Sequence, residues 1–273
     1  MKNINIGFIG GGNMARSLIG GLINSGVPAT SLHVYDIDES SLQQLHRDLN
    51  ITPQASQQAV IDQSEVTVLA IKPQAMKSVI DSITPASVAG KLLISIAAGI
   101  QTTAIQRWLG QDCAIVRAMP NTPALVQSGA TGLYANPHTN DEQKDIAESI
   151  LRAVGLTLWV ADEGQLDAVT ALSGSGPAYF FLVMEAMEEA GKKLGLSAET
   201  ARLLTVQTAF GASKLALEIE EDPAVLRQRV TSPGGTTEKA VQVLQQQQLV
   251  AIFEQALTAA RDRAVELAEQ LGQ

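Results

Sequence analysis

Cysteine is nearly absent from this chain. Cys113 is the only one among 273 residues, so no disulfide can form within the chain. A chain without disulfides is typical of a reducing compartment. The three histidines, His33, His46 and His138, lie far apart and share no metal-ligand spacing with each other or with the cysteine. We therefore expect no metal site, and we expect Cys113 to be a small core residue.

Long apolar runs are also missing, and the N-terminus has neither a basic leader nor a cleavage site. We expect no membrane-spanning helix and no signal peptide. Positive charge is scarce, because 19 Lys and Arg stand against 28 Asp and Glu, a net charge of −9. This charge argues against nucleic acids and anionic membranes as partners. With 45% hydrophobic residues the chain can build a large core, so we expect a globular cytoplasmic protein.

The N-terminal residues have the pattern of a dinucleotide-binding unit. Residues 3–9 predict a buried strand, residues 15–25 an amphipathic helix, and residues 32–36 a second strand. The intervening Gly10-Gly11-Gly12-Asn13-Met14-Ala15 matches G-x-G-x-x-A. Glycines there allow a tight turn, close approach of a pyrophosphate, and close packing of the helix on the strand. In this setting the motif predicts a nicotinamide dinucleotide site.

Asp36, at the end of the second predicted strand, bears on the choice of cofactor. An acid at this place usually accepts hydrogen bonds from the adenosine ribose and repels a 2′-phosphate. Residues 37–41 contain no arginine that could bind such a phosphate. These residues favour NADH over NADPH. Alternatively, Asp36 or Asp38 only caps the helix predicted over residues 40–50.

The alternation of helices and strands continues to about residue 160. A short helix is centred on Ala59, and buried strands are predicted over 66–71, 92–97 and 114–119. Further edge strands over 131–134 and 157–160 flank a helix over 141–154. Ligands of parallel sheets bind beyond the carboxyl ends of the strands. We therefore expect the cofactor near the residues that follow these strands, namely Ala70-Ile71-Lys72-Pro73, Ala97-Ala98-Gly99 and Pro120-Asn121-Thr122-Pro123.

Two of these segments have alternative interpretations. Lys72 could be an ordinary solvated lysine. The two prolines around Asn121 and Thr122 predict a loop rather than a helix, and that loop could be only a rigid turn.

Beyond Asp162 the strand patterns end, and the remaining chain is helical. We predict an α/β protein with a Rossmann-type dinucleotide-binding domain over 1–162 and an all-α domain over 163–273. Helices are expected over 165–194, 198–218, 223–230 and 249–271. Ser173-Gly174-Ser175-Gly176-Pro177 predicts a kink in the first, facing either the cofactor or a partner helix. The many apolar helix faces predict a homodimer through the C-terminal helices.

Another helix opens at Pro233-Gly234-Gly235-Thr236-Thr237. Its first N–H groups lack helical partners and lie at the positive end of the helix dipole. Such a helix start can bind a carboxylate. Either threonine could instead cap the helix.

Together these motifs resemble the Δ1-pyrroline-5-carboxylate reductase family. The resemblance covers nearly the whole chain and rests on residues 8–14, 70–73, 95–99, 117–123, 173–179 and 230–237. It implies reduction of L-1-pyrroline-5-carboxylate to L-proline by NADPH or NADH, the last step of proline biosynthesis. It also implies a homo-oligomer in which dimers form rings, commonly decamers.

The resemblance also implies roles for individual residues. The cofactor would contact Gly10, Gly11, Gly12, Asn13, Met14, Ala70, Ile71, Lys72, Pro73, Ala97, Ala98 and Gly99. The substrate carboxylate would rest on backbone N–H groups of Gly235, Thr236 and Thr237, and the Thr237 hydroxyl would bond the ring nitrogen. Glu220 matches a position that contacts substrate across the dimer, and Arg229 stands where some relatives carry Asn. Relatives often place Ser or Thr near Asp36 and favour NADPH, so both cofactors stay open.

The implied chemistry agrees with a site that lacks histidine and cysteine. A cyclic imine can already be protonated near neutral pH, so positioning and fixed dipoles can suffice. Two other functions remain open. A β-hydroxyacid dehydrogenase would need a lysine on the long helix after residue 162, where Ser173-Gly174-Ser175 stands instead and Lys192 comes much later. The other is a dinucleotide-binding protein without turnover.

Overall fold

The computed structural model describes residues 4–273 and divides into two compact units. The N-terminal unit comprises the described residues up to Ser175 together with Ala259–Gln273. The helical unit is Gly176–Thr258. The end of the last helix thus packs with the N-terminal unit, so the two units are not simple halves of the sequence.

Within residues 4–273, the N-terminal unit contains an eight-stranded sheet in the order β3-β2-β1-β4-β5-β6-β7-β8. All neighbours are parallel except β6 and β7, which are antiparallel. This sheet confirms the predicted α/β class. The strands are β1 (Ile6–Ile9), β2 (Leu32–Tyr35), β3 (Thr52–Pro53), β4 (Val66–Leu69), β5 (Leu92–Ser95), β6 (Ala114–Met119), β7 (Gly129–Ala135) and β8 (Gly155–Trp159).

Some strand bounds differ from those expected. The first strand begins at Ile6 and not at residue 3, which lies outside the described residues. β3 has only two residues, too few to leave an alternating pattern. The chain passes from β1 to β2 on one side and returns to β4 on the other. This reversal creates the switch point at which open parallel sheets bind ligands.

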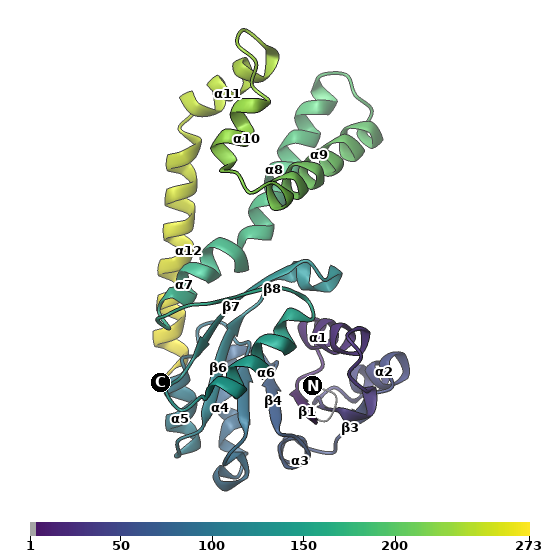
Figure 1. Cartoon of the computed structure of the whole chain (residues 1–273), viewed down its shortest axis with the longest axis vertical. Helices are drawn as coiled ribbons and strands as arrows, with labels where there is room; N and C mark the ends of the chain where they lie inside the picture. Colours follow the sequence, from purple (N-terminus) through teal and green to yellow (C-terminus); the bar gives the residue numbers. More distant parts are fainter. Residues whose placement is uncertain (1–3) are drawn as a thin grey trace. The chain divides into compact units, whose positions relative to one another are not determined.

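Helices cover both faces of the sheet (Figure 1). Buried side chains of α1 (Asn13–Asn24), α2 (Glu39–Leu49) and α6 (Asp141–Arg152) form one apolar core with the strands. Those of α3 (Gln57–Gln63), α4 (Pro73–Asp81) and α5 (Thr102–Leu109) form the other. Neither α4 nor α5 is among the helices predicted from the sequence. Short 3₁₀ helices lie at η1 (Ala29–Ser31) and η2 (Pro85–Val88).

The loop predicted around Asn121 and Thr122 is wrong in part. A 3₁₀ helix, η3 (Thr122–Val126), begins there with Pro123 in its first turn. Proline is tolerated at a helix start, because the missing N–H has no partner there and the fixed φ suits a helix.

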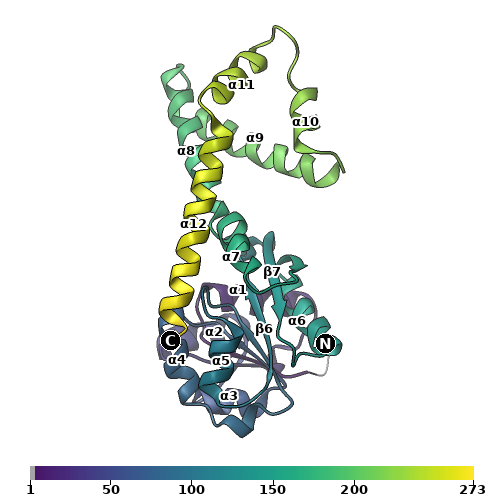
Figure 2. The same ribbon diagram turned by 90° about the vertical axis from the view of Figure 1, so that its left-hand side faces the viewer.

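The kink predicted at Ser173-Gly174-Ser175 takes the form of a π-helix. α7 (Gln165–Val169) runs into η4 (Thr170–Gly174), and α8 (Gly176–Lys193) follows. α7 lies beside β7 (Figure 2), where a Cβ on Gly132 would stand 2.8 Å from Val169 Cγ1. Glycine at this position lets the helix approach the sheet.

A buried cation joins β6 to α7. The Arg117 side chain has its Nη1 3.3 Å from Glu163 Oε1 and its Nη2 3.6 Å from Asp167 Oδ1. The Glu163 carboxylate also accepts from the N–H and the hydroxyl of Thr102, each at 2.8 Å. Thr102 opens α5, so this carboxylate meets the positive end of a helix. One guanidinium therefore serves two carboxylates.

Asp167→Asn is expected to raise the Tm at pH 7. Burial raises the pKa of Asp167, although Arg117 opposes this shift. A carboxyl whose pKa is higher in the folded state costs stability when ionised, and the cost disappears as pH falls through the folded pKa. Thermal melts of both proteins from pH 7 downward will check this. The advantage of the variant should shrink with acidification, and a lower Tm at pH 7 would contradict the expectation.

The helical unit contains α8, α9 (Ala198–Glu218), α10 (Pro223–Arg229), α11 (Thr236–Gln246) and the first part of α12 (Leu249–Leu271). α8 and α9 form a hairpin, in which a Cβ on Gly191 would lie 3.3 Å from Ala201 Cβ. Much of the apolar surface is uncovered. Its large apolar side chains that are 61–86% exposed are Phe180, Phe181, Leu182, Leu194, Leu203, Phe210, Leu217, Val230 and Val250. Among the described residues, no helix is both long enough and apolar enough to cross a membrane.

Candidate active site

The glycine loop lies at the carboxyl end of β1, as predicted. Gly10 has φ +101°, and a Cβ there would stand 2.3 Å from the Ala70 carbonyl oxygen. This position therefore requires glycine. Gly12 is exposed, and a Cβ built on it would meet no atom within 4 Å. It precedes α1, whose N-terminus carries no side-chain cap within the described chain. The N–H groups around Asn13 and Met14 are thus available to an anion.

Asp36 is bonded to the glycine loop itself. Its Oδ2 accepts from the Gly11 N–H at 2.6 Å, and its Oδ1 accepts from the Asp38 N–H at 2.9 Å. Asp38 is the residue that caps α2, accepting from the N–H groups of Ser40 and Ser41. Hydrogen bonds from these two serines lower the pKa of Asp38 to about 2. The structure therefore separates the two roles left open by the sequence: Asp38 caps the helix and Asp36 faces the loop.

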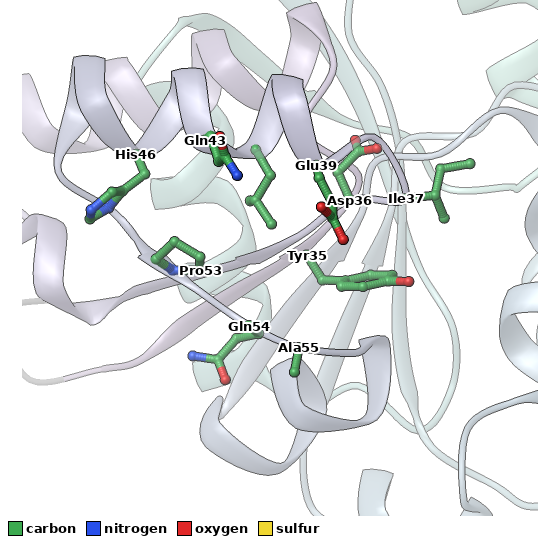
Figure 3. A pocket seen from close by; sticks show the side chains of 10 residues that line it. Tyr35, Asp36, Ile37, Glu39, Gln43, His46, Pro53, Gln54 and Ala55 are labelled. Carbon is green, nitrogen blue, oxygen red and sulfur yellow. The ribbon is translucent and has the colours of Figure 1, made fainter.

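A pocket of about 370 Å³ adjoins Asp36 (Figure 3). It lies between α2 and the segment after β3, and Ile37 at its edge is 89% exposed. The pocket places an apolar side chain and a carboxylate at the carboxyl end of β2. Its lining residues are Tyr35, Asp36, Ile37, Glu39, Leu42, Gln43, His46, Pro53, Gln54 and Ala55.

The segments after β4 and β5 lie at the same edge of the sheet. Ala70 donates its N–H to Ile9 O at 2.8 Å, beside the glycine loop. Ile71 follows, and the exposed Lys72 is the N-cap residue of α4, with Pro73 in its first turn. After β5, Ala98 is half-buried, whereas Ala97 and Gly99 are buried. A Cβ on Gly99 would lie 3.4 Å from the Ala268 nitrogen of α12.

Asn121 follows β6 and is also at this edge. Its side chain is bonded at both ends: Nδ2 donates to Ser173 O at 3.0 Å, and Oδ1 accepts from the Ala130 N–H at 2.9 Å. The predicted cofactor contacts in this unit thus come together at the carboxyl ends of β1, β2, β4, β5 and β6.

In the helical unit, the Pro233–Thr237 segment starts a helix as predicted. Gly234 has φ +73°, and Gly235 is the N-cap of α11. The described structure shows no side-chain cap here, so the expectation that Thr236 could cap is wrong: Thr236 and Thr237 are already in the first turn. Gly235 donates its N–H to Ser232 O at 3.0 Å. The first-turn N–H groups without a helical acceptor include those of Thr236 and Thr237, both of which are exposed residues.

Glu220 lies shortly before α10, and Arg229 is the last residue of that helix. Glu220 is exposed. Arg229 pairs with the neighbouring acid, its Nη2 2.6 Å from Glu221 Oε1. The Arg229 guanidinium is therefore paired with the Glu221 carboxylate within the helical unit. The described residues contain no group of three or more His, Cys, Asp or Glu placed to bind a metal. Cys113 is buried, as expected, and burial raises the pKa of its thiol to about 11.

Comparisons with known proteins match both parts of the chain. A family model described as "Pyrroline-5-carboxylate reductase dimerisation" matches residues 163–267, and one described as "NADP oxidoreductase coenzyme F420-dependent" matches residues 5–99. A pyrroline-5-carboxylate reductase of Pseudomonas aeruginosa is 52% identical over 273 residues, which is 100% of both chains.

Solved structures agree. The structure of a pyrroline-5-carboxylate reductase from Coxiella burnetii has a TM-score of 0.93 and 47% identity, covering 97% of this chain and 98% of the other. The pyrroline carboxylate reductase of Plasmodium falciparum, solved with NADP bound, has a TM-score of 0.87 and 29% identity over 98% and 99%. The chain belongs to the pyrroline-5-carboxylate reductase family.

As a member of this family, the chain is an NAD(P)H-dependent oxidoreductase acting on a C=N bond. It carries the family's dimerisation region, so it is built to form a homo-oligomer. The reductase activity and the homo-oligomer both agree with what the sequence motifs predict.

Sequence patterns miss two sets of contacts in the structure. Glu238 Oε2 accepts from the Gly234 N–H at 2.9 Å and holds the turn before α11. No capping-box pattern marks this contact, because the N-cap is Gly235 and the carboxylate accepts from the residue before it. No signal marks the partners of Arg117, because Glu163 and Asp167 lie 46 and more residues away.

Proposed function

We propose that this chain reduces L-1-pyrroline-5-carboxylate to L-proline in the cytoplasm, as the last step of proline biosynthesis. The observation that carries the proposal is the open N-terminus of α11, where Thr236 and Thr237 offer backbone N–H groups and hydroxyls. A carboxylate bound at this helix start would meet both free donors and the positive end of the helix dipole.

For the dinucleotide, we propose that the pyrophosphate binds over Gly10-Gly11-Gly12 at the start of α1. Asn13 and Met14 would supply first-turn N–H groups. Ala70, Ile71, Lys72 and Pro73 would line the middle of the cofactor, and Ala97, Ala98 and Gly99 the nicotinamide end. Support comes from the shared sheet edge and from Gly12, which leaves the loop open to close approach.

The reaction asks little proton chemistry of the protein. The dinucleotide supplies a hydride to the imine carbon, and the ring nitrogen ends protonated. Where the imine enters protonated, hydride transfer gives the neutral ring amine, which then takes up a second proton from water. The Thr237 hydroxyl would donate a hydrogen bond to the ring nitrogen, and its role would then be either to orient the ring or to pass it a proton. Fixed dipoles and positioning carry most of the catalysis.

We further propose that the dimer forms through the C-terminal helices and that dimers assemble into rings. The uncovered apolar side chains of α8 and α9 support this, because so much exposed apolar surface is rare on a monomer. Glu220 would reach the substrate of the other subunit, and Arg229 would act through its pair with Glu221. A domain boundary after residue 162 is supported by the start of the dimerisation match at residue 163.

Oxidation of NADH and NADPH with pyrroline-5-carboxylate tests the function, and 3-hydroxy acids with NAD⁺ and NADP⁺ serve as the comparison. We expect oxidation of the reduced dinucleotide with the imine and none of the reverse reaction with hydroxy acids. Activity only with hydroxy acids would favour a β-hydroxyacid dehydrogenase. Dinucleotide binding without turnover of either substrate would favour a non-catalytic protein.

A further inference from the structure

Both ends of the Asn121 side-chain amide are hydrogen-bonded within the protein. Asn121 is 9% exposed, and its amide bridges two backbone groups far apart in sequence. One is the Ala130 N–H at the start of β7, and the other is the Ser173 carbonyl in the π-helix η4. The side chain thus joins three segments of the N-terminal unit: the end of β6, the start of β7, and the π-helix.

The π-helix that Asn121 holds is a single wide turn. Ser175 donates its N–H to Thr170 O at 2.8 Å, and Ser173 Oγ donates to Val169 O at 3.1 Å. Gly174 rests on the end of β6, where a Cβ would stand 2.7 Å from Met119 Cε. π-helices are rare, and they are frequent at functional sites. This one lies against the end of β6, at the edge of the sheet that we propose lines the dinucleotide.

We propose that Asn121 is a positioning residue that fixes the π-helical turn Thr170–Gly174 on the carboxyl end of β6, in place of a side-chain contact with the dinucleotide. The amide oxygen has its donor in Ala130, and the amide nitrogen has its acceptor in Ser173. The π-helical turn is followed directly by α8, with the half-buried Ser175 between them. A shift of Ser173 would therefore also move Ser175. The role of this turn in turnover rests on the proposed function.

The chain offers a matched control in Asn136. This residue is 2% exposed, donates from Nδ2 to Cys113 O at 2.9 Å, and accepts from the Ile115 N–H at 3.1 Å. It thus bridges two backbone groups as Asn121 does, but at the start of β6, away from the strand ends that line the proposed site. Asn→Asp at either position keeps the acceptor and turns the donor into a second acceptor.

The experiment compares Asn121→Asp, Asn121→Ala and Asn136→Asp with the parent full-length protein. It measures the dissociation constant of NADH by fluorescence, hydrogen exchange of the amides of residues 170–176, and kcat and KM for pyrroline-5-carboxylate. For both Asn121 variants we expect faster exchange in this turn and a kcat/KM lowered about tenfold or more. We expect the dissociation constant of NADH to stay within about twofold of the parent value. This change is smaller than the one that the loss of a direct hydrogen bond to NADH would cause. Asn136→Asp should lower only the Tm.

A rise of about fivefold or more in the NADH constant for Asn121→Ala, with unchanged exchange of the turn, would overturn the proposal and make Asn121 a cofactor ligand. Equal behaviour of Asn121→Asp and Asn136→Asp would also overturn it. If the parent protein does not turn over pyrroline-5-carboxylate, the proposed function fails. The exchange and binding measurements still decide whether Asn121 holds the turn.

Discussion

Thr237→Ala should lower kcat for pyrroline-5-carboxylate about 100-fold, the loss typical when one preorganised hydrogen-bond donor at the reacting atoms is removed. The dissociation constants of NADH and NADPH should stay within about twofold, because the hydroxyl lies in the helical unit, on the first turn of α11, and not on the glycine loop. Steady-state kinetics with both dinucleotides, together with fluorescence titration of the reduced cofactor, will measure the two effects separately.

Thr236→Ala is the matched control for this prediction. Thr236 is one residue earlier in the same turn and is also exposed, and its replacement leaves the backbone donors of α11 in place. It should change kcat much less. Thr237→Ser keeps the hydroxyl and should restore most of the activity. If Thr237→Ala shows unchanged kcat and KM, the threonine has no part in the mechanism.

Asp36→Ser should shift the ratio of kcat/KM for NADPH over NADH upward by about 100-fold. A carboxylate near a 2′-phosphate costs several kcal/mol across an interface, and 100-fold corresponds to about 2.7 kcal/mol. The surroundings strengthen the expected bias toward NADH, since Asp38 and Glu39 stand beside Asp36 and no Lys or Arg lies in residues 37–41. Kinetics with each dinucleotide at saturating imine measure the ratio.

The structure adds a second consequence of Asp36→Ser. Asp36 also holds the Gly11 N–H at 2.6 Å, so removing it frees a donor of the glycine loop. We expect the KM for both dinucleotides to change. The change in cofactor preference is therefore measured by the ratio of kcat/KM for NADPH over NADH. Asp38→Asn is the control, because it keeps an oxygen for the α2 cap while removing a neighbouring charge. An unchanged ratio in Asp36→Ser would mean that the carboxylate only shapes the loop.

Local patterns predict the elements whose signal is repeated several times along the chain. The strands of the buried sheet, α1, α12 and the helix start at Gly235 all follow from apolar patterns and helix-start residues. The strand β3 escapes prediction, since two residues are too few for a period to be seen. The two prolines after β6 predict a loop, but the 3₁₀ helix η3 begins there at Thr122. The prediction fails because proline is compatible both with loops and with the first turn of a helix.

The sequence by itself determined the α/β class, the glycine loop, the acid after the second strand and the family, because these depend on residues that are close together or on motifs in a known order. Only the tertiary structure decided what the side chains do. It assigned the helix cap to Asp38 and the loop contact to Asp36, paired Arg117 with Glu163 and Asp167, and tied Asn121 to Ser173, 52 residues away. Hydrogen bonds and ion pairs between residues so far apart in sequence depend on how strands and helices pack in space. A local sequence pattern contains no information about that packing.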